Sequence, residues 1–286
     1  MPTNLNPENI KALALDLDGT VLRPGAVLSE RTIRALRSCQ ERGVRIIIAT
    51  GRAIEAVEKF RLPLGAEGPM VYFNGAIVAS MPGTKILHTC LLEPGAVDYC
   101  IDLSRELGVY YHVFFPGTAE HPGQILVAEK EGSERDMYYN HTGLLAEIGD
   151  LKTFLKGPGL KRAVKSMFLA EPEVQDTIRP RLEERFGKSI YIARTYRNFL
   201  EIMNSRVSKG QGLRIALEHQ GLTSQEVLAF GDEENDLPMF ETAGFSAAPA
   251  NAKDTVKAAA DFVLASNAED GVAAFLEELF SLPLKG

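Results

Sequence analysis

Short apolar runs alternate with amphipathic stretches near the start of the chain. Residues 12–16, 45–50 and 70–73 are rich in aliphatic side chains, which is typical of buried strands. Between them, residues 29–43 begin with a helix-capping Ser and end with a helix-stopping Gly, and residues 54–62 are also amphipathic. The order strand, helix, strand, helix, strand predicts parallel strands joined by right-handed crossovers.

The same alternation returns after about residue 206. The predicted helices lie near residues 209–220, 237–242, 252–259 and 271–280, and the predicted strands are residues 227–230, 245–248 and 262–264. Together the two ends of the chain predict an α/β fold, with one doubly wound, Rossmann-like parallel sheet as its core.

Between these ends the pattern changes, and aromatic and β-branched runs replace the aliphatic ones. Predicted strands lie at residues 109–115, 125–128, 165–170, 190–195 and 199–203, and predicted helices lie near residues 95–107 and 173–186. We therefore expect an inserted α+β domain over residues 83–205, with strands that are at least partly antiparallel, and a core built from residues 1–82 and 206–286. An insertion at one exposed loop can move as a lid over the parent sheet.

Composition narrows the class of protein. The 286 residues carry a formal net charge of −7 without any basic stripe, which argues against a nucleic acid partner. The polar start and the absence of a bilayer-length apolar run predict a cytoplasmic protein without a membrane partner. Cys39, Cys90 and Cys100 show no metal-binding spacing, so we expect reduced thiols.

The chemistry is expected first at the end of the strand at residues 12–16. The stretch Asp16-Leu17-Asp18-Gly19-Thr20 places two carboxylates where an open α/β sheet keeps its active site. Carboxylates spaced i and i+2 point to the same side of an extended chain and can share a cation. The alternative is a solvated turn rich in Asp and Gly.

Three further polar stretches stand at predicted strand ends or helix starts. Thr50-Gly51-Arg52 offers a hydroxyl and backbone amides at the mouth of a helix, which suits an anion or an ordinary cap. Lys209 opens a helix, where the helix dipole disfavours it unless an anion lies nearby. The acidic run from Asp232 to Asp236 follows the strand at residues 227–230, and a divalent cation would relieve its repulsion.

Each of these stretches lies at the carboxyl end of a predicted parallel strand or at a helix start, and each supplies a part that phosphoryl transfer needs. With these motifs in this order, the chain resembles the haloacid dehalogenase superfamily. The resemblance is to its Cof-type phosphatases, of cap subclass IIB, and it covers essentially the whole chain. Its motifs here are DLDGT, TGR, FNGA, EI…VSKG, GDEEND and the tail SNAEDGV. One departure is the segment from Ala248 to Ala252, where the family usually has Met-Gly before the Asn.

The resemblance implies a role for each motif residue. Asp16 would be the nucleophile that forms an aspartyl phosphate, and Asp18 the general acid and base. Mg²⁺ would be held by the carboxylates of Asp16 and Asp232 and the backbone carbonyl of Asp18. The remaining implied residues are Leu17, Thr50, Gly51, Lys209 and Asn235 for phosphate, Asp236 for support behind the metal ligands, and Asn74 and Gly75 for substrate.

The expected function is hydrolysis of small phosphorylated metabolites such as sugar phosphates. A phosphomutase and a metabolite-binding regulator on the same fold are the alternatives. Glu233 and Glu234 are expected to be solvated, with ligation through water as the alternative. In the insert, the residues considered for substrate contact are Tyr111, His112, His121, His141, Arg194, Tyr196 and Arg197, and for each one an ordinary surface or core role is favoured. The sequence names neither one substrate nor an oligomeric state.

Overall fold

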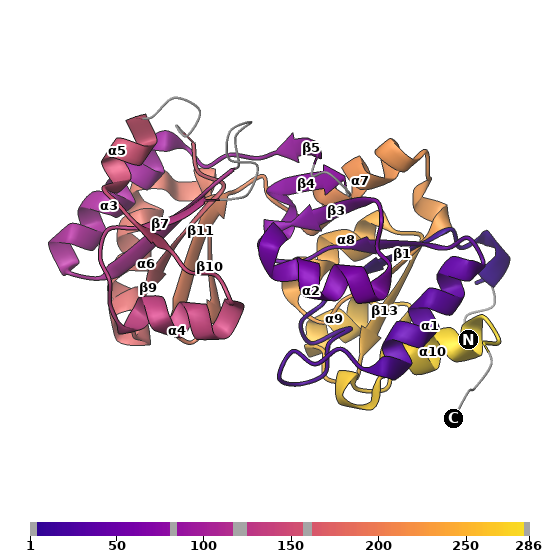
Figure 1. The fold of residues 1–286 in the computed structure, drawn as a ribbon. Helices are drawn as coiled ribbons and strands as arrows, with labels where there is room; N and C mark the ends of the chain where they lie inside the picture. The colour runs from indigo at the N-terminus through magenta and orange to yellow at the C-terminus, as the bar shows by residue number, and fades with distance from the viewer. Residues whose placement is uncertain (1–4, 81–84, 117–124, 157–161, 283–286) are drawn as a thin grey trace. The chain divides into compact units, whose positions relative to one another are not determined.

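The computed structural model describes residues 5–80, 85–116, 125–156 and 162–282 (Figure 1). Contacts divide the chain into two compact units. The core unit comprises Met1–Arg52, Val57–His88 and Ser208–Gly286, and the insert unit comprises Ala53–Ala56 and Thr89–Val207. The predicted insert, residues 83–205, differs from the insert unit by a few residues at each end and by the short piece at 53–56.

The core unit contains a five-stranded parallel sheet in the order β14-β13-β12-β1-β2. The strands are β1 (Ala12–Leu15), β2 (Arg45–Ile48), β12 (Val227–Phe230), β13 (Phe245–Pro249) and β14 (Phe262–Leu264). Most of their side chains are buried, which explains the nearly continuous apolar runs. The fold class predicted from the sequence is confirmed. The central position of β1, between β12 and β2, brings the segments that follow these strands to one edge of the sheet.

The helices of the core unit agree closely with the predicted ones. They are α1 (Glu30–Glu41), α2 (Ile54–Leu64), α7 (Lys209–Gln220), α8 (Leu237–Thr242), α9 (Asp254–Ala259) and α10 (Gly271–Leu279). Ser29 caps α1 by accepting a hydrogen bond from the Thr32 amide. Helix α1 packs against α10 (Figure 1). Residues of α7, α8 and α9 share an apolar cluster with the sheet, which anchors the start of α7 near the strand ends.

The prediction that residues 70–73 continue the parallel sheet needs correction. Strand β3 (Pro69–Tyr72) belongs to a separate three-stranded sheet with β4 (Ile77–Ser80) and β5 (Lys85–Thr89), and it pairs antiparallel with β4. An isolated parallel bridge joins it to the residue after β2, Ala49 to Val71. Phe73 and Asn74 have φ values of 49° and 55°, so the chain reverses there in place of crossing over.

The insert unit contains a six-stranded, mostly antiparallel sheet in the order β10-β11-β9-β6-β7-β8. The strands are β6 (Tyr110–Phe115), β7 (Ile125–Ala128), β8 (Glu147–Ile148), β9 (Lys165–Leu169), β10 (Ile190–Tyr196) and β11 (Phe199–Asn204). The helices are α3 (Pro94–Leu107), α4 (Ser133–Thr142), α5 (Leu151–Lys156) and α6 (Pro172–Phe186). Side chains of α3 and α6 form an apolar core with one face of the sheet. The sequence did not predict α4, α5 or β8, which are short or only weakly amphipathic.

Candidate active site

The site begins where two neighbouring parallel strands of the core unit end. Asp16 follows β1, and its backbone N–H donates to the Phe230 carbonyl at the end of β12, 3.0 Å away. Asp232 follows Gly231 after β12. Both aspartates are buried, at 5% and 7% exposure. The sheet therefore brings together two carboxylates that are 216 positions apart in the sequence, at the edge where open α/β sheets bind their ligands.

Lys209 reaches this edge from the first turn of α7. Its ammonium donates to Asp16 Oδ1 and to Asp236 Oδ1, each at 2.6 Å, and its side chain is 2% exposed. Ser208 caps the helix by accepting from the Gln211 amide. Lys209 therefore has two anionic partners, which offset the unfavourable helix dipole at the start of α7.

Asp236 uses both of its carboxylate oxygens within the protein. Oδ1 accepts from Lys209, and Oδ2 accepts from the backbone amides of Asp232 and Glu233, at 2.9 and 3.0 Å. Asp236 is fully buried. These bonds shape the acidic turn and leave Asp236 without an uncommitted oxygen, which suits a supporting role behind Asp232 and Lys209. Glu233 and Glu234 are exposed, and Glu233 pairs with Lys253 at 2.8 Å.

Thr20 and Gly19 hold Asp232 from the opposite loop. The Thr20 hydroxyl donates to Asp232 Oδ1 at 2.6 Å. Gly19 has a φ of +81°, and a Cβ added there would lie 2.1 Å from Asp232 Oδ2. Only glycine allows the loop after β1 to approach this carboxylate so closely.

The electrostatics of the cluster are dominated by negative charge. Burial raises the pKa of Asp16 well above its usual range; Lys209 opposes the rise and Asp236 adds to it. Burial also raises the pKa of Asp232 to about 6, against the hydrogen bond from Thr20. Burial alone would lower the pKa of Lys209, but the attraction of its carboxylate partners outweighs burial and raises the pKa. Three carboxylates against one ammonium leave two negative charges uncompensated.

The donor set fits a divalent cation. Asp16, Asp232 and Asp236 each offer a carboxylate oxygen, and these atoms lie within 4.8 Å of one another. Asp236 is already committed, whereas Asp16 Oδ2 and Asp232 Oδ2 have no hydrogen-bond partner among the described residues. Carboxylate oxygens without a hydrogen-bond donor are the kind of ligand that hard cations such as Mg²⁺ take.

Asp18 does not join this carboxylate group. The chain turns immediately after Asp16, because the Leu17 carbonyl accepts from the amides of Thr20, Val21 and Leu22, at 3.4, 3.1 and 2.8 Å. The expectation that an i and i+2 spacing aims both side chains at one cation is therefore wrong, since it assumed an extended chain. The Asp18 side chain is 54% exposed and pairs with Arg52. The side chain of Leu17 is buried, so only its backbone is available to a ligand.

The residues predicted to bind phosphate and substrate form a second group. Asn235 Nδ2 donates to Asn74 Oδ1 at 2.9 Å, and the Asn74 amide donates to the Thr50 carbonyl, also at 2.9 Å. Asn235 Oδ1 is buried without a hydrogen-bond partner in the described parts of the chain. A Cβ on Gly51 would lie 3.1 Å from Asn74 Oδ1, so these motifs are in close contact.

Backbone geometry explains why residue 75 is a glycine. Its φ is +103°, and a Cβ there would lie 2.2 Å from the Ser208 carbonyl oxygen. The residue lets the turn after β3 approach the start of α7.

The segment that departs from the usual family pattern still contacts the site. Pro249 ends β13, and Asn251 Nδ2 donates to the Gly19 carbonyl at 2.7 Å. Asn251 Oδ1 accepts from the Asn267 amide at 2.9 Å. The departure therefore leaves Asn251 in contact with the loop after β1. Thr20, Arg52 and Asn251 were not among the predicted site residues, although the motifs DLDGT and TGR and the segment 248–252 contain them.

The candidates of the insert unit lie in different environments. Tyr111 faces the apolar core, with its ring centroid 4.6 Å from that of Phe168. His112 is fully buried, and burial, followed by the charge of Lys165, lowers its pKa to about 3. His121 lies outside the described residues.

The other insert candidates interact with their own unit. Arg194 pairs with Asp176 at 2.6 Å, and Arg197 with Glu171 at 3.2 Å. The ring of His141 contacts that of Tyr196 in a tilted arrangement, with centroids 4.8 Å apart and an interplanar angle of 37°. These contacts account for both arginines within the insert unit, and of the predicted insert residues the structure brings His141 and Tyr196 into contact.

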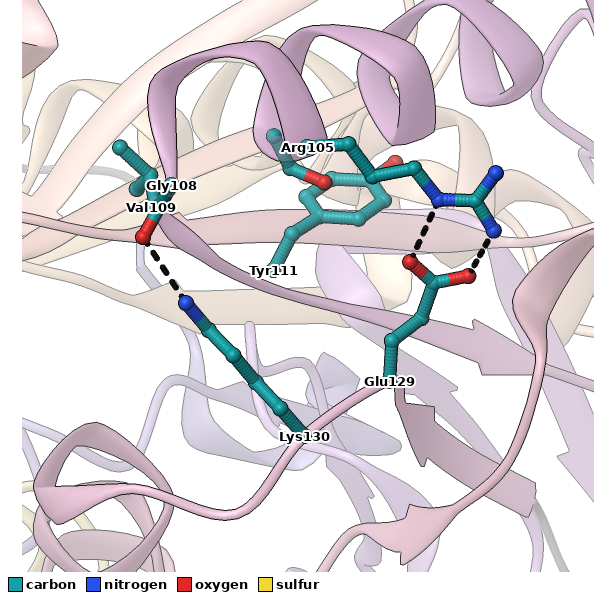
Figure 2. Close-up of a pocket in the computed structure, with 7 residues that line it drawn as sticks. Arg105, Gly108, Val109, Tyr111, Glu129 and Lys130 are labelled. Carbon is teal, nitrogen blue, oxygen red and sulfur yellow. Dashed lines mark hydrogen bonds and ion pairs between the residues drawn. The ribbon is translucent and has the colours of Figure 1, made fainter.

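Tyr111 also lines a cavity of about 270 Å³ between α3, β6 and the end of β7 (Figure 2). Two charged groups around it form an ion pair, in which Arg105 Nε donates to Glu129 at 2.8 Å. The Lys130 ammonium donates to the Gly108 backbone carbonyl at 2.8 Å. The Tyr111 hydroxyl is buried without a hydrogen-bond partner among the described residues. The lining contains one carboxylate, that of Glu129, so the cavity does not hold an acidic cluster like the one around Asp16.

Comparison with known proteins gives these motifs a context. The sequence pattern of the haloacid dehalogenase-like hydrolases matches residues 13–276. The chain belongs to this family. The resemblance drawn from the sequence is thereby confirmed, and so is the prediction of a phosphatase of this family. No helix in the described ranges has the length and apolar character of a membrane span.

Relatives and solved structures cover nearly the whole chain. The 5-amino-6-(5-phospho-D-ribitylamino)uracil phosphatase YitU of Bacillus subtilis is 31% identical over 282 residues, which cover 94% of this chain and 97% of that protein. The pyridoxal phosphate phosphatase YbhA of Escherichia coli is 29% identical, with coverage of 93% and 97%. A haloacid dehalogenase-like hydrolase from Bacteroides thetaiotaomicron superposes with a TM-score of 0.84 at 26% identity, with coverage of 95% and 100%.

Proposed function

We propose that this phosphatase is Mg²⁺-dependent and hydrolyses small phosphorylated metabolites through an aspartyl phosphate on Asp16. The observation that carries the proposal is the state of the Asp16 carboxylate. It is buried, Lys209 donates to one of its oxygens at 2.6 Å, and the other oxygen has no donor among the described residues. The carboxylates of Asp16 and Asp232 offer oxygens within 4.8 Å of each other. A carboxylate oriented in this way can attack phosphorus.

The roles of the side chains follow from their positions. Asp16 would form a bond to phosphorus while the bond to the leaving oxygen breaks. Asp18, on the exposed side of the turn, would give a proton to that oxygen and later take one from the attacking water. Mg²⁺, bound by Asp16, Asp232 and the Asp18 carbonyl, would neutralise charge on the phosphate.

The phosphate would be held by groups around Asn235. Lys209 is the cation nearest to Asp16, and Asn235 and the loop of Thr50 and Gly51 are linked through Asn74. We assign Lys209, Asn235, Thr50 and Gly51 to the phosphoryl oxygens, and the Leu17 amide with them. Asn74 would border the substrate, with Gly75 behind it.

We propose further that the core unit performs the chemistry and that the insert unit is a cap that selects the leaving group. The names of the relatives YitU and YbhA support phosphorylated metabolites as the substrate class. The net charge of −7 favours small molecules over nucleic acids as partners, and the free cysteines Cys39, Cys90 and Cys100 fit a cytoplasmic location.

The test is a panel of sugar phosphates, pyridoxal phosphate and para-nitrophenyl phosphate, assayed for released phosphate with MgCl₂ and with EDTA. Activity should require Mg²⁺, and rapid quench of Asp18→Asn with para-nitrophenyl phosphate should trap phosphate on the protein. Phosphate release that persists after exhaustive metal removal would refute the metal role. Isomerised substrate in place of free phosphate would indicate a mutase.

A further inference from the structure

Asp18 occupies an unusual position for a group proposed to transfer a proton. Its side chain is 54% exposed, whereas that of Asp16 is 7% exposed. An exposed aspartate on a turn has no packing that selects one rotamer. Because proton transfer requires hydrogen-bond geometry, something other than packing has to orient this carboxylate.

Arg52 makes the contact that can orient it. Arg52 Nε donates to Asp18 Oδ2 at 2.7 Å, and Nη2 donates to Asp18 Oδ1 at 2.6 Å. Two parallel bonds between planar groups restrict both the position and the rotation of the carboxylate. Arg52 is itself held, since its side chain is only 16% exposed and its guanidinium lies over the Phe60 ring, 5.2 Å from the centroid.

The backbone of Arg52 is also anchored in the proposed phosphate loop. Its amide donates to Thr50 Oγ1 at 3.1 Å, and its carbonyl accepts from the Phe73 amide at 3.1 Å. Movement of Arg52 is therefore coupled to the loop of Thr50 and to the turn that carries Asn74. All of these residues lie in the core unit.

We propose that Arg52 is a positioning residue that holds the Asp18 carboxylate in the orientation used for proton transfer. The inference rests on the proposed role of Asp18 as general acid and base. Both side-chain hydrogen bonds from the Arg52 guanidinium described above end on the Asp18 carboxylate, and the proposal assigns its contribution to that contact. The geometry also explains why arginine stands here, because lysine offers a single point charge without the planar pair of donors.

The test compares two leaving groups in a double-mutant cycle. Arg52→Met keeps the alkyl stem over Phe60 but removes both donors. It should lower kcat for phenyl phosphate by up to about 10²-fold, the scale expected for misplaced catalytic groups. The loss with para-nitrophenyl phosphate should be much smaller, because nitrophenolate needs little proton donation. KM should change little, and Arg52→Lys should recover part of the rate.

The double-mutant cycle distinguishes positioning of Asp18 from a direct action of Arg52 on the substrate. In an Asp18→Asn background, Arg52→Met should change kcat by less than about twofold, because the group it positions is already lost. Lys59→Met is the matched control: Lys59 is exposed and its ammonium also lies near the Phe60 ring, at 5.0 Å, without a bond to Asp18. This variant should retain wild-type rates with both substrates.

Each contrary outcome has a distinct meaning. Equal losses on both substrates, or a full loss of rate in the Asp18→Asn background, would show that Arg52 acts on substrate directly and would overturn the positioning role. An Arg52→Met enzyme as fast as wild type would overturn it as well. If Asp18→Asn itself shows no dependence on the leaving group, the acid and base role of Asp18 fails first.

Discussion

Each unit contains a buried lysine that pairs with carboxylates, Lys209 in the core unit and Lys165 in the insert unit. In the core unit, Lys209 lies between Asp16 and Asp236, with Asp232 close by. In the insert unit, Lys165 on β9 pairs with the carboxylate of Glu201 on β11, and both are nearly fully buried. The core cluster carries excess negative charge, whereas Lys165 and Glu201 together form a neutral pair.

The difference shows how a site can be told from a buried ion pair. A neutral pair satisfies itself, and replacing it by apolar groups is often harmless to stability. Uncompensated carboxylates raise each other's pKa and remain costly until a cation or a proton arrives. Burial, with the neighbouring carboxylates, raises the pKa of Asp16 and of Asp232, which singles out the core cluster as the candidate functional site.

The strongest test of the core cluster is Asp16→Asn. The amide keeps the size of the side chain but is a far poorer nucleophile, so the rate of phosphate release should fall by about four powers of ten or more. Circular dichroism should show an unchanged fold. A variant with a near-normal rate would exclude Asp16 as the nucleophile.

The neutral pair is tested by removing one partner and then both. Lys165→Met leaves Glu201 buried without its cation and should lower the free energy of unfolding by about 3–5 kcal/mol. The double variant Lys165→Met/Glu201→Met should recover most of this loss, as measured by urea denaturation. MgCl₂ should not rescue the single variant. If it did, the insert cluster would be a cation site too.

Metal binding should stabilise the protein only through the core cluster. At a Mg²⁺ concentration about 100-fold above Kd, the free energy of unfolding should rise by about 2.7 kcal/mol, visible as a higher Tm. Asp232→Asn should remove this shift. The same variant should be more stable than wild type in EDTA at neutral pH, because it removes a carboxylate whose ionisation burial opposes.

The smallest effect is a pH dependence of Mg²⁺ affinity. The metal binds ionised carboxylates, and the pKa of Asp232 is raised to about 6, so protons compete below that pH. Apparent affinity should be level above about pH 6 and should fall about tenfold per unit below it for each competing proton. Calorimetric titration across this range measures it. A flat profile would place the metal on other ligands.

The sequence alone predicted most elements of the core unit. Residues 209–220, 227–230 and 237–242 form α7, β12 and α8 with the predicted bounds. These segments have a clear pattern of apolar residues and clear residues at their ends, so the local sequence is enough to predict their secondary structure. The turn at Phe73 and Asn74 was missed, because its positive φ values depend on close packing of Gly75 against Ser208, which no local pattern encodes.

The sequence by itself determined which chemical groups are available and at which strand ends they stand. Asp16 and Asp232 had to meet, because each follows a central strand of one parallel sheet. Only the tertiary structure decided which carboxylates share the cluster and which do not. The turn at Leu17 sends Asp18 to Arg52, while Lys209 and two amides occupy Asp236. Hydrogen bonds between residues far apart in sequence make these choices, and spacing along the chain carries no information about them.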